Sequence, residues 1–87
     1  MREYVYKYPL SPIADEVRVG MPRGARILHV REQNGVPTLW ALVDPMVANG
    51  ERVFAIRGTG HLVADGLEYL GSAHCGVFVW HVFEVLP

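Results

Sequence analysis

Apolar and polar residues alternate at period two along most of the chain, which is the pattern of a β-strand with one buried face. Residues 4–8 place three tyrosines on one face, and residues 17–21 alternate in the same way up to a proline. Further strand-type segments cover residues 27–32, 36–44, 52–57, 67–73 and 77–85. The pattern therefore predicts six or seven short strands. No segment keeps a helical period for longer than about two turns.

Turn residues mark the connections between these strands. Asn34-Gly35 is a strong two-residue hairpin signal, so the flanking strands are expected to pair antiparallel. Pro37 lies near a strand start, where a missing amide costs little. The short strand 17–21 is expected at a sheet edge. These features predict an all-β fold, a small antiparallel meander that forms a sandwich or a partly closed barrel with little or no helix.

Two predicted strands are apolar on both faces. Residues 39–43 and 77–83 lack the polar alternation expected where one side of an antiparallel sheet meets water. Either curvature into a closed core or a partner subunit has to cover the second face. A chain of 87 residues supports one hydrophobic core of limited size. We therefore expect a single β domain over residues 1–87 that forms a homodimer or a higher homo-oligomer.

Charge and cysteine content narrow the partners and the compartment. Eight Lys and Arg against nine Asp and Glu give a net charge of −1, so no long-range field attracts a nucleic-acid polymer. The single cysteine, Cys75, suits a reducing compartment. Neither a secretory signal nor an apolar run of membrane-spanning length is evident. These observations predict a soluble cytoplasmic protein that binds no nucleic-acid polymer and no membrane.

The sharpest candidate site is Arg57-Gly58-Thr59-Gly60-His61, at the end of a predicted strand. Two glycines allow successive amides to point into one concavity, Thr59 adds a hydroxyl, and Arg57 and His61 would flank the concavity with donors. A phosphate or carboxylate would fit there. In the competing interpretation the glycines only permit a tight turn. A dinucleotide fold or a P-loop is excluded because no strand, glycine loop and helix follow one another.

Trp40, Trp80 and His81 are further candidates for a ligand pocket. Each tryptophan either packs in the core or an interface, or offers a stacking surface to a nucleobase. His81 is either a core histidine with one hydrogen bond or a donor that lines a pocket. The histidine and cysteine spacings match no metal motif, and no nucleophile motif surrounds a serine or the cysteine. The sequence thus predicts no metal, no cofactor and no catalytic residue.

Five segments in order along the chain carry a family resemblance: Lys7-Tyr8-Pro9-Leu10, Met21-Pro22-Arg23-Gly24-Ala25, Trp40-Ala41-Leu42-Val43-Asp44, Gly58-Thr59-Gly60-His61 and His81-Val82-Phe83-Glu84. The chain resembles a family of small phage and prophage proteins whose function is not established. The resemblance implies the host cytoplasm as the setting. It also implies a context in which small homo-oligomeric phage proteins sequester nucleotide immune signals, such as cyclic ADP-ribose derivatives or cyclic dinucleotides.

These observations together lead to a functional expectation. We expect a non-enzymatic homo-oligomer that sequesters a small phosphorylated ligand, a nucleotide-derived host signal, for example of ADP-ribose type. The loop Arg57–His61 would hold the phosphates, and Trp40 or Trp80 would stack on the base.

Two alternatives remain open. A phage interaction module without a ligand would have wholly buried tryptophans and a convex 58–61 turn. A small nucleotide hydrolase would need a carboxylate or histidine pair that converges on the pocket.

Overall fold

A computed structural model describes residues 2–87, which form seven antiparallel β-strands and no helix. The strands are β1 (Tyr4–Pro9), β2 (Glu16–Pro22), β3 (Arg26–Gln33), β4 (Val36–Val43), β5 (Asn49–Gly58), β6 (Leu67–Cys75) and β7 (Phe78–Val85). Each strand expected from the alternation is present. The largest shift is in β5, which begins at Asn49 and not at residue 52. The described residues contain no helix that could span a membrane.

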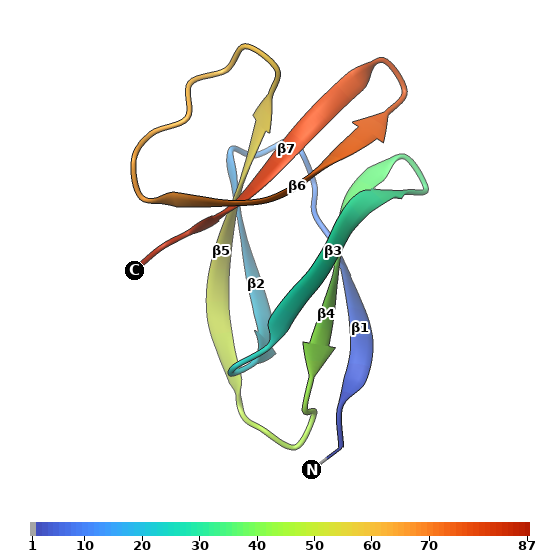
Figure 1. Cartoon of the computed structure of the whole chain (residues 1–87), viewed down its shortest axis with the longest axis vertical. Helices are drawn as coiled ribbons and strands as arrows, with labels where there is room; N and C mark the ends of the chain where they lie inside the picture. The colour runs from blue at the N-terminus through green and yellow to red at the C-terminus, as the bar shows by residue number, and fades with distance from the viewer. Residues whose placement is uncertain (1) are drawn as a thin grey trace.

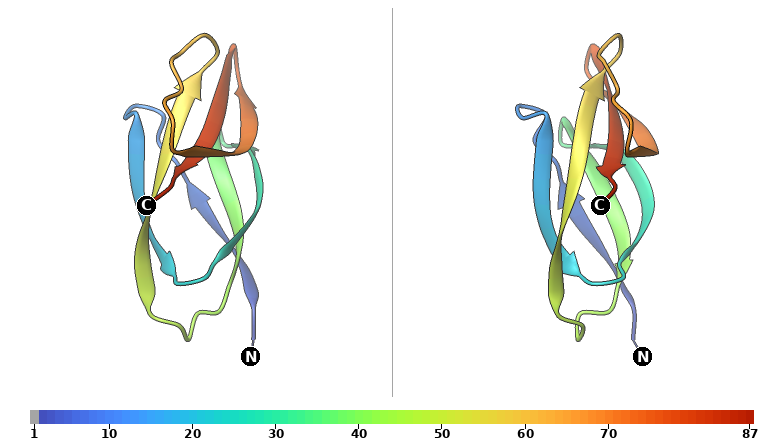
Figure 2. Two further views of the ribbon diagram at one scale, coloured as in Figure 1. Left: turned by 60° about the vertical axis from the view of Figure 1, so that its left-hand side comes forward. Right: turned by 90° about the vertical axis from the view of Figure 1, so that its left-hand side faces the viewer.

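The strands form two sheets that face each other as a sandwich (Figures 1 and 2). One sheet has the order β1-β4-β3 and the other the order β2-β5-β7-β6. The expected all-β sandwich is therefore confirmed, and the sheets do not close into a barrel. Strand β2 lies at an edge, as its short alternating segment predicted.

The strand order departs from a sequential meander. β1 pairs with β4 and β2 pairs with β5, so only β3–β4 and β6–β7 are hairpins of consecutive strands. The chain changes sheets after β1, after β2 and after β4; the second change is a tight turn in which the Ala25 amide donates to the Pro22 carbonyl. A turn of this kind can close a hairpin or change sheets, and the alternation pattern does not distinguish the two.

The Asn34-Gly35 hairpin forms as predicted. Both residues have positive φ, 54° and 79°, which a two-residue type I′ turn requires. The flanking residues pair as Gln33 with Val36. The Glu32 carboxylate accepts a hydrogen bond from the Gly35 amide at 2.8 Å, which supports the turn from one side.

The core lies between the two inner sheet faces. β4 and β7 are each an internal strand of their sheet, which explains much of their apolar character. The two tryptophans of these strands are partly exposed, so neither is wholly buried. The largest fully buried side chains are Phe54, Leu10, Met21, Leu39, Val43, Val82, Thr38 and Pro37.

Two close approaches join the sheets. Arg52 of β5 makes a two-pronged ion pair with Glu84 of β7, with N–O distances of 2.6 and 2.7 Å, and its third donor reaches the Ala25 carbonyl near the other sheet. Gly71 of β6 packs directly on Val30 of β3, where a Cβ on the glycine would lie 2.9 Å from the valine Cβ. These contacts hold one side of the sandwich closed.

Candidate functional site

The Gly58–His61 segment forms a turn that is closed twice. The His61 amide donates to the Gly58 carbonyl at 3.1 Å, and the Gly58 amide donates to the His61 ring nitrogen Nδ1 at 3.1 Å. Gly60 has φ of 90°, a backbone conformation that favours glycine at this turn position. The Gly58 amide, one of the two glycine amides expected to form an anion-binding concavity, is therefore already hydrogen-bonded within the turn.

The His61 ring lies against Gly58. A Cβ on Gly58 would be 2.9 Å from the ring atom Cε1, so the imidazole occupies the side-chain space of residue 58. Gly58 is directly opposite Trp80 in the β5–β7 ladder, and opposed residues share a face. Since Nδ1 accepts a hydrogen bond, a neutral His61 carries its proton on Nε2 and presents a donor there.

A pocket of about 320 Å³ lies between this turn and the start of β7, at the upper end of Figure 1. Its lining residues are Gly58, Thr59, His61, Val77, Phe78, Val79 and Trp80. The Phe78 and Trp80 rings stack with centroids 5.3 Å apart and an interplanar angle of 19°. Phe78 is 58 % exposed. The pocket therefore combines an aromatic wall with a polar turn.

Four residues predicted from the sequence meet in this pocket: Gly58, Thr59, His61 and Trp80. Phe78 was not predicted as a site residue. Its position two residues before Trp80 was an available signal, because residues i and i+2 of a strand share a face.

Thr59 is also the end of a chain of hydrogen bonds across three strands. Its hydroxyl lies 2.9 Å from Nε2 of His81, and Nδ1 of His81 lies 2.7 Å from the Ser72 hydroxyl. The Tyr69 hydroxyl lies 2.7 Å from that of Ser72. Both nitrogens of the half-buried imidazole are thus satisfied. His81 itself is absent from the pocket lining and is connected to it through this hydrogen bond with Thr59.

Ser72 and Tyr69 could not be identified as site residues from local sequence. Ser72 lies opposite His81 in the β6–β7 ladder, and Arg57 lies opposite His81 on its other side. Only the pairing of β6, β7 and β5 brings these residues into one row.

Arg57 does not flank the pocket with His61. Its guanidinium donates to the carbonyls of Leu62 at 3.1 Å, Asp15 at 2.9 Å and Ile56 at 3.2 Å. Arg57 alternates with Gly58 along β5, so it belongs to the opposite sheet face from the pocket turn. The role of Arg57 is structural, because its hydrogen bonds connect the segment before β2 to the segment that follows the Gly58–His61 turn.

Trp40 lies in the other sheet, away from the pocket. It is opposite Lys7 of β1 and His29 of β3, and the His29 and Trp40 rings are 6.0 Å apart with a tilt of 45°. The two tryptophans therefore do not line one cavity. Any stacking on a pocket ligand comes from Trp80 and Phe78.

The remaining reactive groups do not form a second site of this kind. Burial raises the pKa of the Cys75 thiol, and the Glu32 carboxylate adds to this effect, so the thiol is a poor nucleophile at neutral pH. Among residues 2–87, no three His, Cys, Asp or Glu side chains come together as metal ligands.

Comparison with known proteins identifies a family without an assigned activity. The family whose model matches residues 1–87 is described as "Domain of unknown function (DUF7352)". No curated protein and no solved structure matches the chain. A functional argument therefore has to start from the pocket.

Proposed function

The chain belongs to the DUF7352 family, and we propose that it captures a small nucleotide-type ligand in the pocket between the Gly58–His61 turn and β7. The observation that supports this most is the stacked Phe78–Trp80 pair beside Thr59 and His61. Stacking of a base on an aromatic side chain contributes about 1–3 kcal/mol and tolerates different bases. The pocket volume of about 320 Å³ is at the lower end for ligand sites, which suits one planar ring.

Two polar groups would orient the ligand. His61 offers Nε2–H because its other nitrogen accepts from the Gly58 amide. Thr59 also lines this pocket, and its hydroxyl is hydrogen-bonded to His81. These groups would meet the edge of a ring or a single phosphate oxygen. The proposal therefore rests on stacking with two polar residues beside the rings, whereas the sequence had suggested a cationic phosphate cradle around Arg57.

The phage resemblance directs the choice of ligand. Nucleotide-derived immune signals, including ADP-ribose derivatives and cyclic dinucleotides, combine a planar base with phosphates. Sequestration of such a signal requires only binding that removes it from solution in the host cell, with no chemical step. Hydrolysis is the weaker alternative, because the described pocket lining has one histidine and no carboxylate.

Calorimetric titration with a panel of AMP, ADP-ribose, cyclic ADP-ribose and cyclic dinucleotides tests the proposal directly. We expect micromolar or tighter binding of at least one ligand, and a loss of about tenfold in affinity for Phe78→Ala, whose exposed ring leaves the core intact when removed. Trp40→Phe, in the other sheet, is the matched aromatic control and should bind normally. Absence of binding across the panel would refute the proposal.

The ligand recovered after denaturation separates capture from hydrolysis. Chromatography should return the nucleotide unchanged after prolonged incubation with stoichiometric protein. Conversion of the ligand by the wild type, and no conversion by Thr59→Val, would establish the hydrolase alternative in place of capture.

An interaction module is the second candidate, and one observation favours it. Leu62 is 84 % exposed and Val63 is 45 % exposed, and both follow the pocket turn along the chain. Exposed apolar side chains of this kind are typical of a protein-binding surface. The double variant Leu62→Ser/Val63→Ser should keep nucleotide affinity if the pocket binds a small ligand. Loss of a defined host protein from co-purification, with no nucleotide bound by the wild type, would favour the module.

A further inference from the structure

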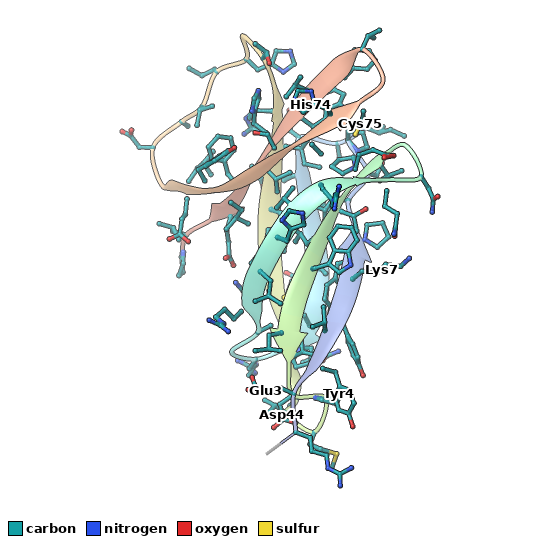
Figure 3. All side chains as sticks on the ribbon, turned by 45° about the vertical axis from the view of Figure 1, so that its right-hand side comes forward. Glu3, Tyr4, Lys7, Asp44, His74 and Cys75 are labelled. Atoms are coloured by element: carbon teal, nitrogen blue, oxygen red, sulfur yellow. The ribbon has the colours of Figure 1, made fainter. Side chains whose placement is uncertain are left out.

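Strand β1 forms an open edge of its sheet. Within residues 2–87 it pairs with β4 alone, and Figures 1 and 3 show no other strand on its outer side. The Leu10 amide donates to the Pro37 carbonyl at 2.8 Å and continues the β1–β4 ladder. Because hydrogen-bonded pairs recur every second residue in an antiparallel ladder, the three tyrosines of β1 direct their backbone groups to β4. Val5 and Lys7 therefore direct theirs outward.

The tyrosine side chains of β1 are only partly covered at this edge of the sheet. Tyr4, Tyr6 and Tyr8 lie opposite buried residues of β4 and so belong to the inner face of the sheet. Tyr4 nevertheless remains 46 % exposed and Tyr6 42 % exposed, and their rings are 6.4 Å apart. The second sheet does not fully cover these rings, so part of the apolar inner face of the sheet is exposed along β1.

The centre of β1 lacks the features that usually prevent an edge strand from pairing with another chain. A lysine on an edge normally blocks strand addition with its charge. Here the Lys7 ammonium donates to the Gln33 side chain of β3 at 2.7 Å, so it lies across the sheet and away from the edge. Pro9 lies at the end of β1, at a position where the backbone nitrogen points outward and a proline has no N–H to donate. The residues before Pro9 keep their outward backbone groups and are free to pair.

We propose that β1 is a homodimerisation site, in which two copies of the chain pair their β1 strands antiparallel about a two-fold axis at Tyr6. Tyr6 then lies opposite the partner's Tyr6, Tyr4 lies opposite the partner's Tyr8, and Val5 lies opposite the partner's Lys7. The outward backbone groups of Val5 and Lys7 provide four hydrogen bonds. The sequence Tyr-Val-Tyr-Lys-Tyr is self-complementary in this register, because the tyrosines repeat symmetrically about its centre.

Charge is compatible with the same register. Lys7 lies opposite the partner's Val5, so the two lysines do not face each other across the axis.

The expected interface is small. A tyrosine buries about 150–250 Å² when fully covered, so the half-exposed Tyr4 and Tyr6 rings of two copies give roughly 400 Å², to which the backbone edges and the exposed Val5 side chains add. The total falls in the range of weak interfaces, below about 1,200 Å², and predicts a reversible dimer. The inference is independent of the ligand pocket, since the two involve different strands.

Sedimentation equilibrium over about a hundredfold range of concentration provides the first test. The wild type should shift from the mass of one chain to that of two. Val5→Pro removes an outward amide without removing a β1–β4 hydrogen bond, so it should fold and remain monomeric; circular dichroism confirms folding. Met46→Ser removes an exposed apolar side chain elsewhere and should still dimerise. A wild type that stays monomeric throughout the range, or an undiminished Val5→Pro dimer, would overturn the proposal.

Disulfide trapping tests the register. In a Cys75→Ser background, Tyr6→Cys places two thiols across the axis in a non-hydrogen-bonded pair, with Cα atoms about 4.5 Å apart. That distance lies within the range of a disulfide. Tyr4→Cys places them roughly 14 Å apart along the strands and should not cross-link. Oxidation should therefore link the first variant and leave the second monomeric, and equal cross-linking of both would contradict the proposed register.

Discussion

The imidazole of His61 lies in the space that a side chain on Gly58 would fill, with the Gly58 amide hydrogen-bonded to Nδ1 of the ring at 3.1 Å. One glycine thus sets both the position of the imidazole and the nitrogen that carries its proton. The orientation of the polar pocket wall depends on this contact.

Gly58→Ala should displace the imidazole. The new Cβ would lie 2.9 Å from Cε1, which is closer than side-chain contacts allow. We expect ligand affinity to fall by about tenfold and the free energy of unfolding to change by less than about 1 kcal/mol, because the exposed imidazole can move aside. Gly20→Ala is the matched control, since the nearest atom to its Cβ would be 4.0 Å away. Chemical denaturation and titration measure both effects, and normal affinity in the Gly58→Ala variant would show that His61 is not a ligand group.

Ser72→Ala should weaken the support of Thr59. It removes a hydrogen-bond partner from Nδ1 of the half-buried His81, which costs about 1–2 kcal/mol of stability. Thr59→Val removes the partner of the other nitrogen. The two changes act on one imidazole, so a double-mutant cycle should give a coupling free energy of at least about 0.5 kcal/mol. Tyr69→Phe, at the exposed end of this series of hydrogen bonds, should lower the free energy of unfolding by less. If the effects of Ser72→Ala and Thr59→Val are strictly additive, the hydrogen bonds do not act together.

Arg52→Met should destabilise the sandwich by about 2–3 kcal/mol, because Glu84 would be left without its counter-charge in a largely covered position. The hydrogen bond with Glu84 raises the pKa of Arg52 above its ordinary value, with burial opposing it. Because the raised pKa keeps Arg52 protonated, the contribution of its charge to this stabilisation is lost only in strong alkali. Denaturation of Arg18→Met provides the control, since the Arg18–Glu51 pair is exposed and should contribute little.

Gly71→Ala should strain the contact between the two sheets. The added Cβ would lie 2.9 Å from the Cβ of Val30, and backbone on both sides restricts any adjustment. The expected loss is about 1–3 kcal/mol in the free energy of unfolding. Val30→Ala should recover part of this loss in the double variant, although alone it destabilises by leaving a cavity. Unfolding curves that show no interaction between the two substitutions would place the clash elsewhere.

Most of the strands were predictable because strand formation depends on short-range pattern. Period-two alternation located the strands, and the Asn34-Gly35 dipeptide located its hairpin because both residues tolerate positive φ. The edge position of β2 also followed from its short segment. The order of strands was not predictable in this way, since the connections after β1, β2 and β4 change sheets in place of closing hairpins.

The candidate site was only partly predictable for the same reason. Gly58, Thr59 and His61 are adjacent in sequence, and Trp80 was a candidate from its apolar strand. Arg57 was expected to share the pocket because it is also adjacent, but alternation along β5 places it on the other face. Neighbours in the sequence of a strand lie on opposite faces, and residues two positions apart share a face.

The sequence by itself determined the all-β class, the strand segments, the hairpin turn and the turn residues of the pocket, because these depend on residues a few positions apart. Tertiary structure decided the pairing of β1 with β4, the row that joins Ser72 to His81, and the union of the Gly58–His61 turn with Phe78 and Trp80. These depend on residues far apart in the chain, whose contacts arise from burying two sheet faces against each other. Local pattern carries no information on which of the many compatible pairings buries them best.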